Sequence, residues 1–335
     1  MNIFNASIFD LLTLTGGLAL FLYGMQLMSE SLGKLSEGRL LSVLESLTNS
    51  RLRAVLLGTG VTAVIQSSSA TTVMVVGLVN SGMLTLSQAV GVIIGANIGT
   101  TVTSWLLGLS DIASGNIFLR LARPTAFSPV LSIIGVFLLL FVKEGKKRDI
   151  GSVLVGFAIL ITGMDTMTQA MKPLCRAPHF AGALTVLDHP LSGLAAGLLF
   201  TAVIQSSSAS VGILQALCAA GSITYAMALP VIVGQNIGTC ATAMLSCIGT
   251  CKNAKRAAVI HLLFNVVGAV VFMALFYTVN SALHFPLLQR QADSTGIALV
   301  HTGFNLSTAL LLLPFADILE KLSLLIVRPQ NGMSA

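Results

Sequence analysis

The chain has 335 residues, of which 55% are hydrophobic and only 9% are charged, and its formal net charge is +6. Soluble domains carry about 25% charged residues, so this composition excludes a soluble protein and predicts a multi-pass membrane protein whose surroundings are the lipid bilayer. The basic residues are scattered over short loops. This is typical of the bias of positive charge towards one side of a membrane, and it argues against a nucleic-acid partner.

The N-terminal segment and the cysteines point to no processing and no metal. No Lys or Arg precedes the first apolar run, so we interpret this run as a retained span and not as a cleaved signal peptide. The cysteines are odd in number and lack the spacing of metal ligands, so we interpret them as free thiols. They are Cys175, Cys218, Cys240, Cys247 and Cys251.

Seven runs are long enough to cross a membrane, which takes about 20 apolar residues as a helix. Between the first two lies Met28–Thr48, where charged and apolar residues mix, and which we predict to be an amphipathic helix at the membrane interface. The predicted spans are Phe9–Ser29, Ser87–Leu107, Pro124–Val142, Gly151–Met171, Tyr225–Ile248, Ala257–Val279 and Gly296–Phe315.

Two further apolar segments have a polar centre. The run Gln-Ser-Ser-Ser-Ala occurs at Gln66–Ala70 and again at Gln205–Ala209, 139 positions later. In the first segment the flanking arms, Leu52–Gln66 and Ala70–Ser81, would be about 22 and 18 Å long as helices. Each arm is shorter than a hydrocarbon core of about 30 Å. The segment, with its counterpart Gly193–Ala220, therefore predicts a re-entrant helical hairpin with no net crossing.

The offset of 139 holds without a gap far beyond the serines, and a weaker match at a shorter offset pairs Arg123 and Gly135 with Arg256 and Gly268. From Thr62 to Thr103, 21 of 42 positions are identical to those from Thr201 to Thr242. Internal duplication of a membrane domain is typical of transporters, although some channels are duplicated too. If each polar segment crossed the membrane once, the halves would be parallel; with hairpins they are inverted.

We therefore predict an all-α integral membrane protein with two inverted structural repeats. Residues 1–142 form the first repeat, with a span, an interfacial helix, a re-entrant hairpin and two spans. Residues 143–279 form the second repeat, and residues 280–335 add a C-terminal span and a cytoplasmic tail.

A second motif recurs at the same offset. Gly95–Thr100 reads Gly-Ala-Asn-Ile-Gly-Thr, and Gly234–Thr239 reads Gly-Gln-Asn-Ile-Gly-Thr. Because two glycines loosen a helix, we expect a broken transmembrane helix at this place in each half. A break at membrane depth exposes backbone amides and carbonyls that can bind ions.

The polar runs supply groups suited to small ions. A helix N-terminus attracts an anion without any Lys or Arg, whereas carbonyl, amide and hydroxyl oxygens suit a hard cation such as Na⁺. The candidate anion ligands are Ser67, Ser68, Ser69, Ser206, Ser207 and Ser208, and the candidate Na⁺ ligands are Gln66, Asn97, Thr100, Gln205, Asn236 and Thr239.

The alternative is that these side chains only hold helices together. That explanation suits an isolated Ser or Thr better than four matched clusters. For Thr71, Thr72 and Thr103, hydrogen bonds back to their own helix explain the residues as well as ligand binding does.

Two histidines and one carboxylate add further candidates. His261 and Asn265 are spaced i, i+4, as are His301 and Asn305, so each pair shares one helix face. They can serve as a relay for protons or substrate, or as hydrogen bonds between helices. Asp165 is a rare carboxylate near the end of a span, where either cation binding or a solvated capping role fits.

The paired Gln-Ser-Ser-Ser runs, the paired Gly-x-Asn-Ile-Gly-Thr motifs and the run His261–Asn265 together resemble the type II sodium/phosphate cotransporter family. The resemblance covers nearly the whole chain. It implies inverted repeats with re-entrant hairpins and Na⁺-driven uptake of inorganic phosphate, with phosphate at the six serines and Na⁺ at the six other candidate ligands.

The chain also departs from the family pattern. Ser128–Ser132 stands in the first half where the second half has His261–Asn265, so any role of that face is asymmetric. Many bacterial members carry a PhoU-like regulatory domain after the transport core, and we expect none within these 335 residues.

The function predicted from the sequence is sodium-coupled symport of phosphate by alternating access, in the cell inner membrane. The alternatives are an anion channel and a transporter of a different oxyanion. We expect no cofactor and leave open a homodimer. An intramembrane serine hydrolase is disfavoured because three consecutive serines in both halves do not form one activated nucleophile, and the first half lacks the histidine, so we expect no enzyme activity.

Overall fold

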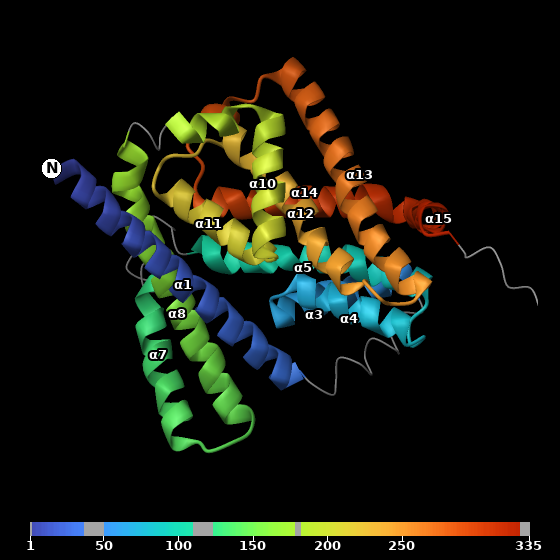
Figure 1. Cartoon of the computed structure of the whole chain (residues 1–335), viewed down its shortest axis with the longest axis horizontal. Coiled ribbons are helices and arrows are strands. Elements are labelled where there is room, and N and C mark those ends of the chain that lie inside the picture. The colour runs from blue at the N-terminus through green and yellow to red at the C-terminus, as the bar shows by residue number, and fades with distance from the viewer. Residues whose placement is uncertain (1, 37–49, 110–122, 178–181, 329–335) are drawn as a thin grey trace, which may run out of the picture.

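The computed structural model describes residues 2–36, 50–109, 123–177 and 182–328, and the regular elements in these ranges are helices (Figure 1). Six helices are long and apolar enough to cross a membrane. They are α1 (Asn2–Ser36), α5 (Leu86–Gly108), α7 (Pro124–Phe141), α8 (Lys146–Arg176), α12 (Tyr225–Ser246) and α13 (Lys252–Leu283). The chain is therefore a multi-pass membrane protein.

Shorter helices complete the described part of the chain. They are α3 (Arg51–Ile65), α4 (Ser68–Asn80), α10 (Pro190–Ile204), α11 (Ser207–Ala219), α14 (Ser294–Leu312) and α15 (Ala316–Ile326), with the 3₁₀ helices η2 (Thr185–Asp188), η3 (Pro286–Gln289) and η4 (Leu313–Phe315). As the sequence predicts, each Gln-Ser-Ser-Ser run separates two short helices.

The seventh predicted span, Gly296–Phe315, forms helix α14 and η4, but α14 is not among the six helices that are long and apolar enough to cross a membrane. Its apolar sequence is interrupted by polar residues such as His301 and Asn305, which are buried against neighbouring helices. A helix covered by protein does not need an apolar surface on every side.

The predicted interfacial helix Met28–Thr48 is wrong in its first part. Residues 28–36 continue α1 without interruption, while residues 37–49 lie outside the described residues. The mixed composition reflects a helix face that packs on other helices, since Met28 is buried next to the exposed Glu30.

The predicted breaks at the two Asn-Ile-Gly-Thr motifs are also wrong, because α5 and α12 run through them as continuous helices. The glycines provide close packing instead. A Cβ on Gly95 would lie 2.0 Å from Val55 O of α3, and one on Gly234 would lie 2.0 Å from Leu194 O of α10. The backbones of these helix pairs therefore touch, and bulkier residues would push them apart.

Helices α3 and α5 run parallel to each other, and so do α10 and α12. Along α3 and α5, a Cβ on Gly91 would contact Ala54 and one on Gly99 would contact Thr59. The residue numbers on both helices increase in the same direction, so the helices are parallel. The same holds for α10 and α12, where Gly197 adjoins Val231 and Gly238 adjoins Leu198. Helix α4 therefore runs back from the end of α3 towards the start of α5, and α11 runs back from the end of α10 towards the start of α12.

Helices α1 and α8 form an antiparallel pair, and they lie side by side in Figure 1. A Cβ on Gly17 would lie 3.1 Å from Gly163 O, and one on Gly24 would lie 2.6 Å from Gly156 O. Gly156 and Gly163 are also the positions 139 residues after Gly17 and Gly24. The contact is therefore reciprocal between equivalent positions of the two halves.

Helices α5 and α14 are antiparallel as well. Near the end of α5, Gly108 O accepts a hydrogen bond from Thr295 Oγ1 at 3.3 Å, close to the start of α14. Further back on α5, Ser104 Oγ lies 2.6 Å from His301 Nδ1. The pair carries buried polar residues along its whole length.

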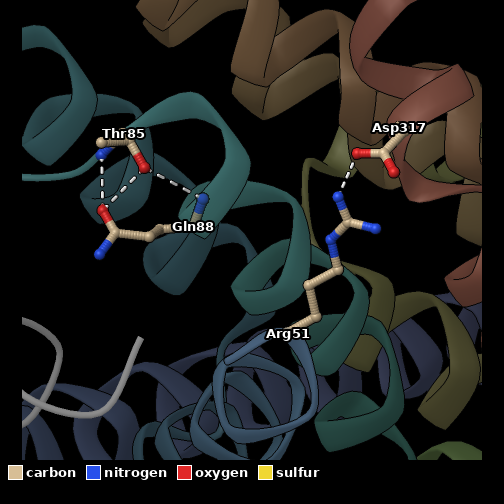
Figure 2. Close-up of polar contacts among 4 residues, drawn as sticks. All are labelled: Arg51, Thr85, Gln88 and Asp317. Atoms are coloured by element: carbon tan, nitrogen blue, oxygen red, sulfur yellow. Dashed lines mark hydrogen bonds and ion pairs between the residues drawn. The ribbon is translucent and has the colours of Figure 1, made fainter. Parts of the chain in front are cut away.

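Two contacts fix the ends of the helices around the first hairpin (Figure 2). Thr85 and Gln88 form a capping box at the start of α5, in which Thr85 N donates to Gln88 Oε1 at 2.9 Å. Arg51, the first residue of α3, forms an ion pair with Asp317 of α15. This ion pair lowers the pKa of the Asp317 carboxyl because the Arg51 guanidinium donates to it.

Candidate functional site

The two Gln-Ser-Ser-Ser runs have the same unusual backbone. Gln66 ends α3 with φ 60°, and Gln205 ends α10 with φ 59°. This left-handed conformation is uncommon for residues other than glycine and often occurs at functional sites. It reverses the chain, so that the next helix starts immediately after the previous one ends.

A serine caps each new helix. Ser67 Oγ accepts a hydrogen bond from Ala70 N at 3.1 Å, and Ser206 Oγ accepts one from Ala209 N at 3.2 Å. The first amides of α4 and α11, on Ser68 and Ser207, precede the first bond of the helical ladder. They are donors at the positive end of a helix dipole.

The two tips meet. Ser69 Oγ donates to the backbone oxygen of Gln205 at 3.4 Å, and Thr242 Oγ1 donates to the same oxygen at 3.3 Å. On the other side, Thr103 Oγ1 donates to Gln66 Oε1 at 2.9 Å. Equivalent threonines of α5 and α12 thus hold the two tips. Thr71 and Thr72, by contrast, bond carbonyls of their own segment.

A cavity of about 180 Å³, which we call the serine cavity, lies between the tips. One water molecule needs about 10–15 Å³ of such space, so the cavity is large enough for several water molecules or small ions. Gln66 and all six serines line it, namely Ser67, Ser68, Ser69, Ser206, Ser207 and Ser208. The six serines predicted as anion ligands are therefore brought together.

Helix α1 supplies the rest of the described lining, and the sequence reasoning did not assign these residues to the site. They are Met25, Gln26, Ser29 and Glu30. Ser29 Oγ donates to Ile65 O at 3.0 Å, and Gln26 Nε2 donates to Glu30 Oε1 at 2.7 Å. The spacing of these four residues on one helix face was the available signal.

The charge of the cavity is unusual for an anion site. Among its described lining residues, Glu30 carries the only formal charge, and no Lys or Arg contributes. A phosphate bound there would face a carboxylate and polar neutral groups. Cations bound with the anion would offset this repulsion.

The remaining predicted Na⁺ ligands lie off the cavity lining. Asn97 and Asn236 are buried in α5 and α12, and each donates its side-chain amide to the carbonyl four residues earlier at 2.9 Å. Thr100 and Thr239 make the equivalent hydroxyl bonds. Gln205 contributes its backbone oxygen to the tip contact, while its side chain is exposed.

The histidine and aspartate candidates also lie outside the cavity lining. His301 bonds Ser104 on α5, which is a hydrogen bond between helices. His261 is buried in α13, and its carbonyl accepts from Asn265. Asp165 is exposed on α8 and accepts a bond from Gln169 Nε2 at 2.6 Å.

Comparison with known proteins identifies the family of this chain. The sequence model described as Na+/Pi-cotransporter matches residues 20–169 and 171–308. The chain belongs to the Na+/Pi-cotransporter family. No solved structure matches it.

Relatives from bacteria and mammals match this chain. YqeW of Bacillus subtilis is 29% identical over 95% of this chain and 98% of its own length. The Escherichia coli protein named "Putative inorganic phosphate export protein YjbB" is 28% identical over 96% of this chain but only 56% of its own length. Mouse sodium-dependent phosphate transport protein 2A is 33% identical over 39% of this chain and 23% of its own length.

Proposed function

We propose that the chain is a secondary active transporter that moves inorganic phosphate together with sodium ions by alternating access. The observation that carries the proposal is the single cavity lined by the serine runs of both halves. Membership of the Na+/Pi-cotransporter family supports phosphate as the substrate and supports a transporter over an enzyme. We further propose the cell inner membrane as its location.

Phosphate fits the donors of this cavity. Two helix N-termini and six serines provide amide and hydroxyl donors without a formal positive charge. Such donors hold an oxyanion through hydrogen bonds and the helix dipole. We assign phosphate to Ser67–Ser69 and Ser206–Ser208, with Ser67 and Ser206 also capping their helices.

Sodium is proposed from the charge of the site. The phosphate dianion would lie in a cavity whose only charged lining residue is Glu30, so the anion alone is repelled. Sodium ions bound beside it, at Gln66 and the carbonyls that end α3 and α10, would remove this repulsion. Binding of the two ions would then be interdependent, which is the physical basis of coupling.

Inverted repeats and re-entrant hairpins complete the proposal. Gly17 meets Gly163, and Gly24 meets Gly156. Such reciprocal contacts are expected where equivalent helices meet across a two-fold axis. Because α1 and α8 are antiparallel, a two-fold axis that relates them is perpendicular to both helices. Such an axis would give the two halves opposite orientations in the membrane. Helices α3 and α5 run parallel and α4 connects them along the chain, so α4 runs back towards the start of α3, which supports entry and return of each hairpin from one side.

Phosphate export is a second candidate, favoured by the names of relatives such as E. coli YjbB. A symporter moves its substrates in either direction, as the ion gradients dictate. An exporter that works without sodium would differ from the proposed mechanism in its ion dependence, and a channel would differ in its inability to concentrate phosphate.

Uptake of ³²P-phosphate into proteoliposomes tests these alternatives. With an inward Na⁺ gradient, we expect internal phosphate to rise above the external concentration, and with choline in place of Na⁺ we expect no accumulation. Equal uptake in Na⁺ and choline rejects sodium coupling. Equilibration without accumulation indicates a channel, and stronger competition by arsenate or sulfate than by unlabelled phosphate rejects phosphate as the substrate.

A further inference from the structure

Two buried oxygen atoms on neighbouring helices have no hydrogen-bond partner among the residues that the structure describes. They are Asn265 Oδ1 on α13 and Thr308 Oγ1 on α14, and each residue is 1% exposed. Asn265 Nδ2 donates to His261 O at 2.9 Å, and the same side chain also bonds the Cys240 thiol of α12, so Oδ1 is the atom of the amide left unsatisfied. Because buried polar atoms are nearly always paired, both oxygens indicate a missing partner.

The two oxygens belong to one contact between α13 and α14. A Cβ on Gly268 would lie 2.2 Å from Thr308 Cγ2, so the glycine lets Thr308 approach the backbone of α13. Asn265 precedes Gly268 by three residues and shares its helix face. The side chains of Asn265 and Thr308 are thus within about one helical turn of each other.

Helix α5 brings a third oxygen to the same level. Ser104 of α5 contacts His301 of the antiparallel α14. Seven residues before Ser104 is Asn97, and seven residues after His301 is Thr308. Seven residues make about two turns, which preserves the helix face, so Asn97 faces Thr308. Helices α5, α13 and α14 each pack against the other two.

The chemistry of this cluster is that of a cation site without formal charge. Asn97 Nδ2 donates to Ile93 O at 2.9 Å, so the side-chain oxygen of Asn97 is the atom that can coordinate a cation. Amide and hydroxyl oxygens are the ligands of hard cations. No carboxylate belongs to the cluster, which favours a monovalent over a divalent ion. Neither Asn265 nor Thr308 lines the serine cavity.

We propose that Asn265, Thr308 and Asn97 bind one sodium ion between α5, α13 and α14, separate from the serine cavity. This inference rests on the proposed sodium coupling, and it adds Asn265 and Thr308 to Asn97, which the sequence already suggested as a Na⁺ ligand. Asn97 lies six residues, about 9 Å along the helix, before Thr103, which holds the first tip. An ion at the cluster would therefore attract phosphate into the cavity through a low-dielectric interior.

Sodium binding to the purified, full-length protein tests the site. We would measure ²²Na⁺ binding without phosphate, and then the Na⁺ dependence of ³²P-phosphate uptake in proteoliposomes. For Thr308→Val and Asn265→Leu, which keep the side-chain shape, we expect the Na⁺ concentration for half-maximal uptake to rise at least fivefold. The KM for phosphate at saturating Na⁺ should stay within twofold of that of the unmodified protein.

A neighbouring hydroxyl provides the matched control. Ser307 Oγ on the same helix donates to Phe304 O at 3.1 Å, so Ser307→Ala should leave the Na⁺ dependence unchanged. Thr308→Ser retains the hydroxyl and should bind ²²Na⁺ like the unmodified protein, even if the valine variant fails to fold.

Two results overturn the site. One is unchanged ²²Na⁺ binding and Na⁺ dependence in both Thr308→Val and Asn265→Leu, which would mean that a water molecule occupies the cluster. The other is the same loss of Na⁺ binding in Ser307→Ala. If the unmodified protein transports phosphate equally in Na⁺ and choline, the proposed function fails instead, and ²²Na⁺ binding still decides whether the cluster holds an ion.

Discussion

The hydroxyl of Ser69 donates to the backbone oxygen of Gln205 across 3.4 Å, although the two residues are 136 positions apart in the chain. This bond joins the start of α4 in one half to the end of α10 in the other. Donor groups of one tip and a carbonyl of the other therefore border the same cavity. Movement of one half against the other would change this contact.

Removal of the Ser69 hydroxyl should weaken phosphate binding. We expect Ser69→Ala to raise the KM for phosphate about tenfold, because in the proposed complex this hydroxyl donates to phosphate in place of Gln205 O, and a hydrogen bond to a charged group contributes roughly 1.5–3 kcal/mol. Uptake of ³²P-phosphate at saturating Na⁺ measures this. Ser81→Ala, at the exposed far end of α4, is the matched control; an equal effect of both variants would contradict the assignment.

Loss of a helix cap should destabilise both hairpins by similar amounts. Ser67→Ala and Ser206→Ala each remove an N-cap bond, which costs about 1 kcal/mol, whereas Ser67→Gly should cost only a few tenths. Thermal unfolding in detergent, without phosphate, separates this effect from ligand binding. Equal stability of all three variants and the unmodified protein would show that the caps are not formed.

Glycines at helix contacts should not tolerate a side chain. An added Cβ on Gly95 would lie 2.0 Å from Val55 O, so we expect Gly95→Ala to reduce the yield of monodisperse protein severely. Gly77 on α4 has open space around its Cα, and Gly77→Ala should be stabilising by up to about 1 kcal/mol through helix propensity. Normal yield and stability of Gly95→Ala would contradict the close packing of α3 and α5.

The carboxylate of the cavity should attract sodium. We expect Glu30→Gln to raise the Na⁺ concentration for half-maximal phosphate uptake, since the cavity loses its only formal charge among the described lining residues. Glu144→Gln, in the exposed connection between α7 and α8, controls for a general change of surface charge. If only Glu144→Gln altered the Na⁺ dependence, Glu30 would have no part in ion binding.

The ion pair between Arg51 and Asp317 should stabilise the protein in a pH-dependent way. Hydrogen bonding to Arg51 lowers the pKa of Asp317 below its unfolded value, so the stabilisation is present above about pH 4 and disappears as the pH falls through the lowered pKa. Arg51→Met should therefore reduce the melting temperature slightly at pH 7 and not at all in strong acid. A difference that persists in acid would exclude the ion pair as its cause. Both side chains are substantially exposed, so added salt should also diminish the effect.

The two apolar arms around the first polar run were predicted well, because apolar length is a local property of the sequence. The expected arms Leu52–Gln66 and Ala70–Ser81 differ by only one or two residues from α3 and α4. The matched register of the two halves, together with Gln66 and Gln205, likewise located the polar tips. These features follow from apolar length and capping residues, which a sequence displays directly.

The predictions were wrong where packing between distant segments of the chain determines the role of a residue. Gly95 and Gly99 were expected to break α5, but their effect is to admit the backbone of α3, which a single segment cannot reveal. Glu30 was assigned to a separate interfacial helix, whereas it extends α1 into the cavity. The orphan oxygens of Asn265 and Thr308 depend on three helices meeting, and no local pattern indicates them.

The number of phosphate ions bound per chain tests the shared site most directly. Equilibrium binding of ³²P-phosphate to the purified protein in saturating Na⁺ should give one phosphate per chain. Either Ser68→Ala or Ser207→Ala should weaken that single binding event, because each serine contributes to the same cavity. Two phosphate ions per chain, or a variant that loses half of the binding while the other half keeps its affinity, would contradict the account.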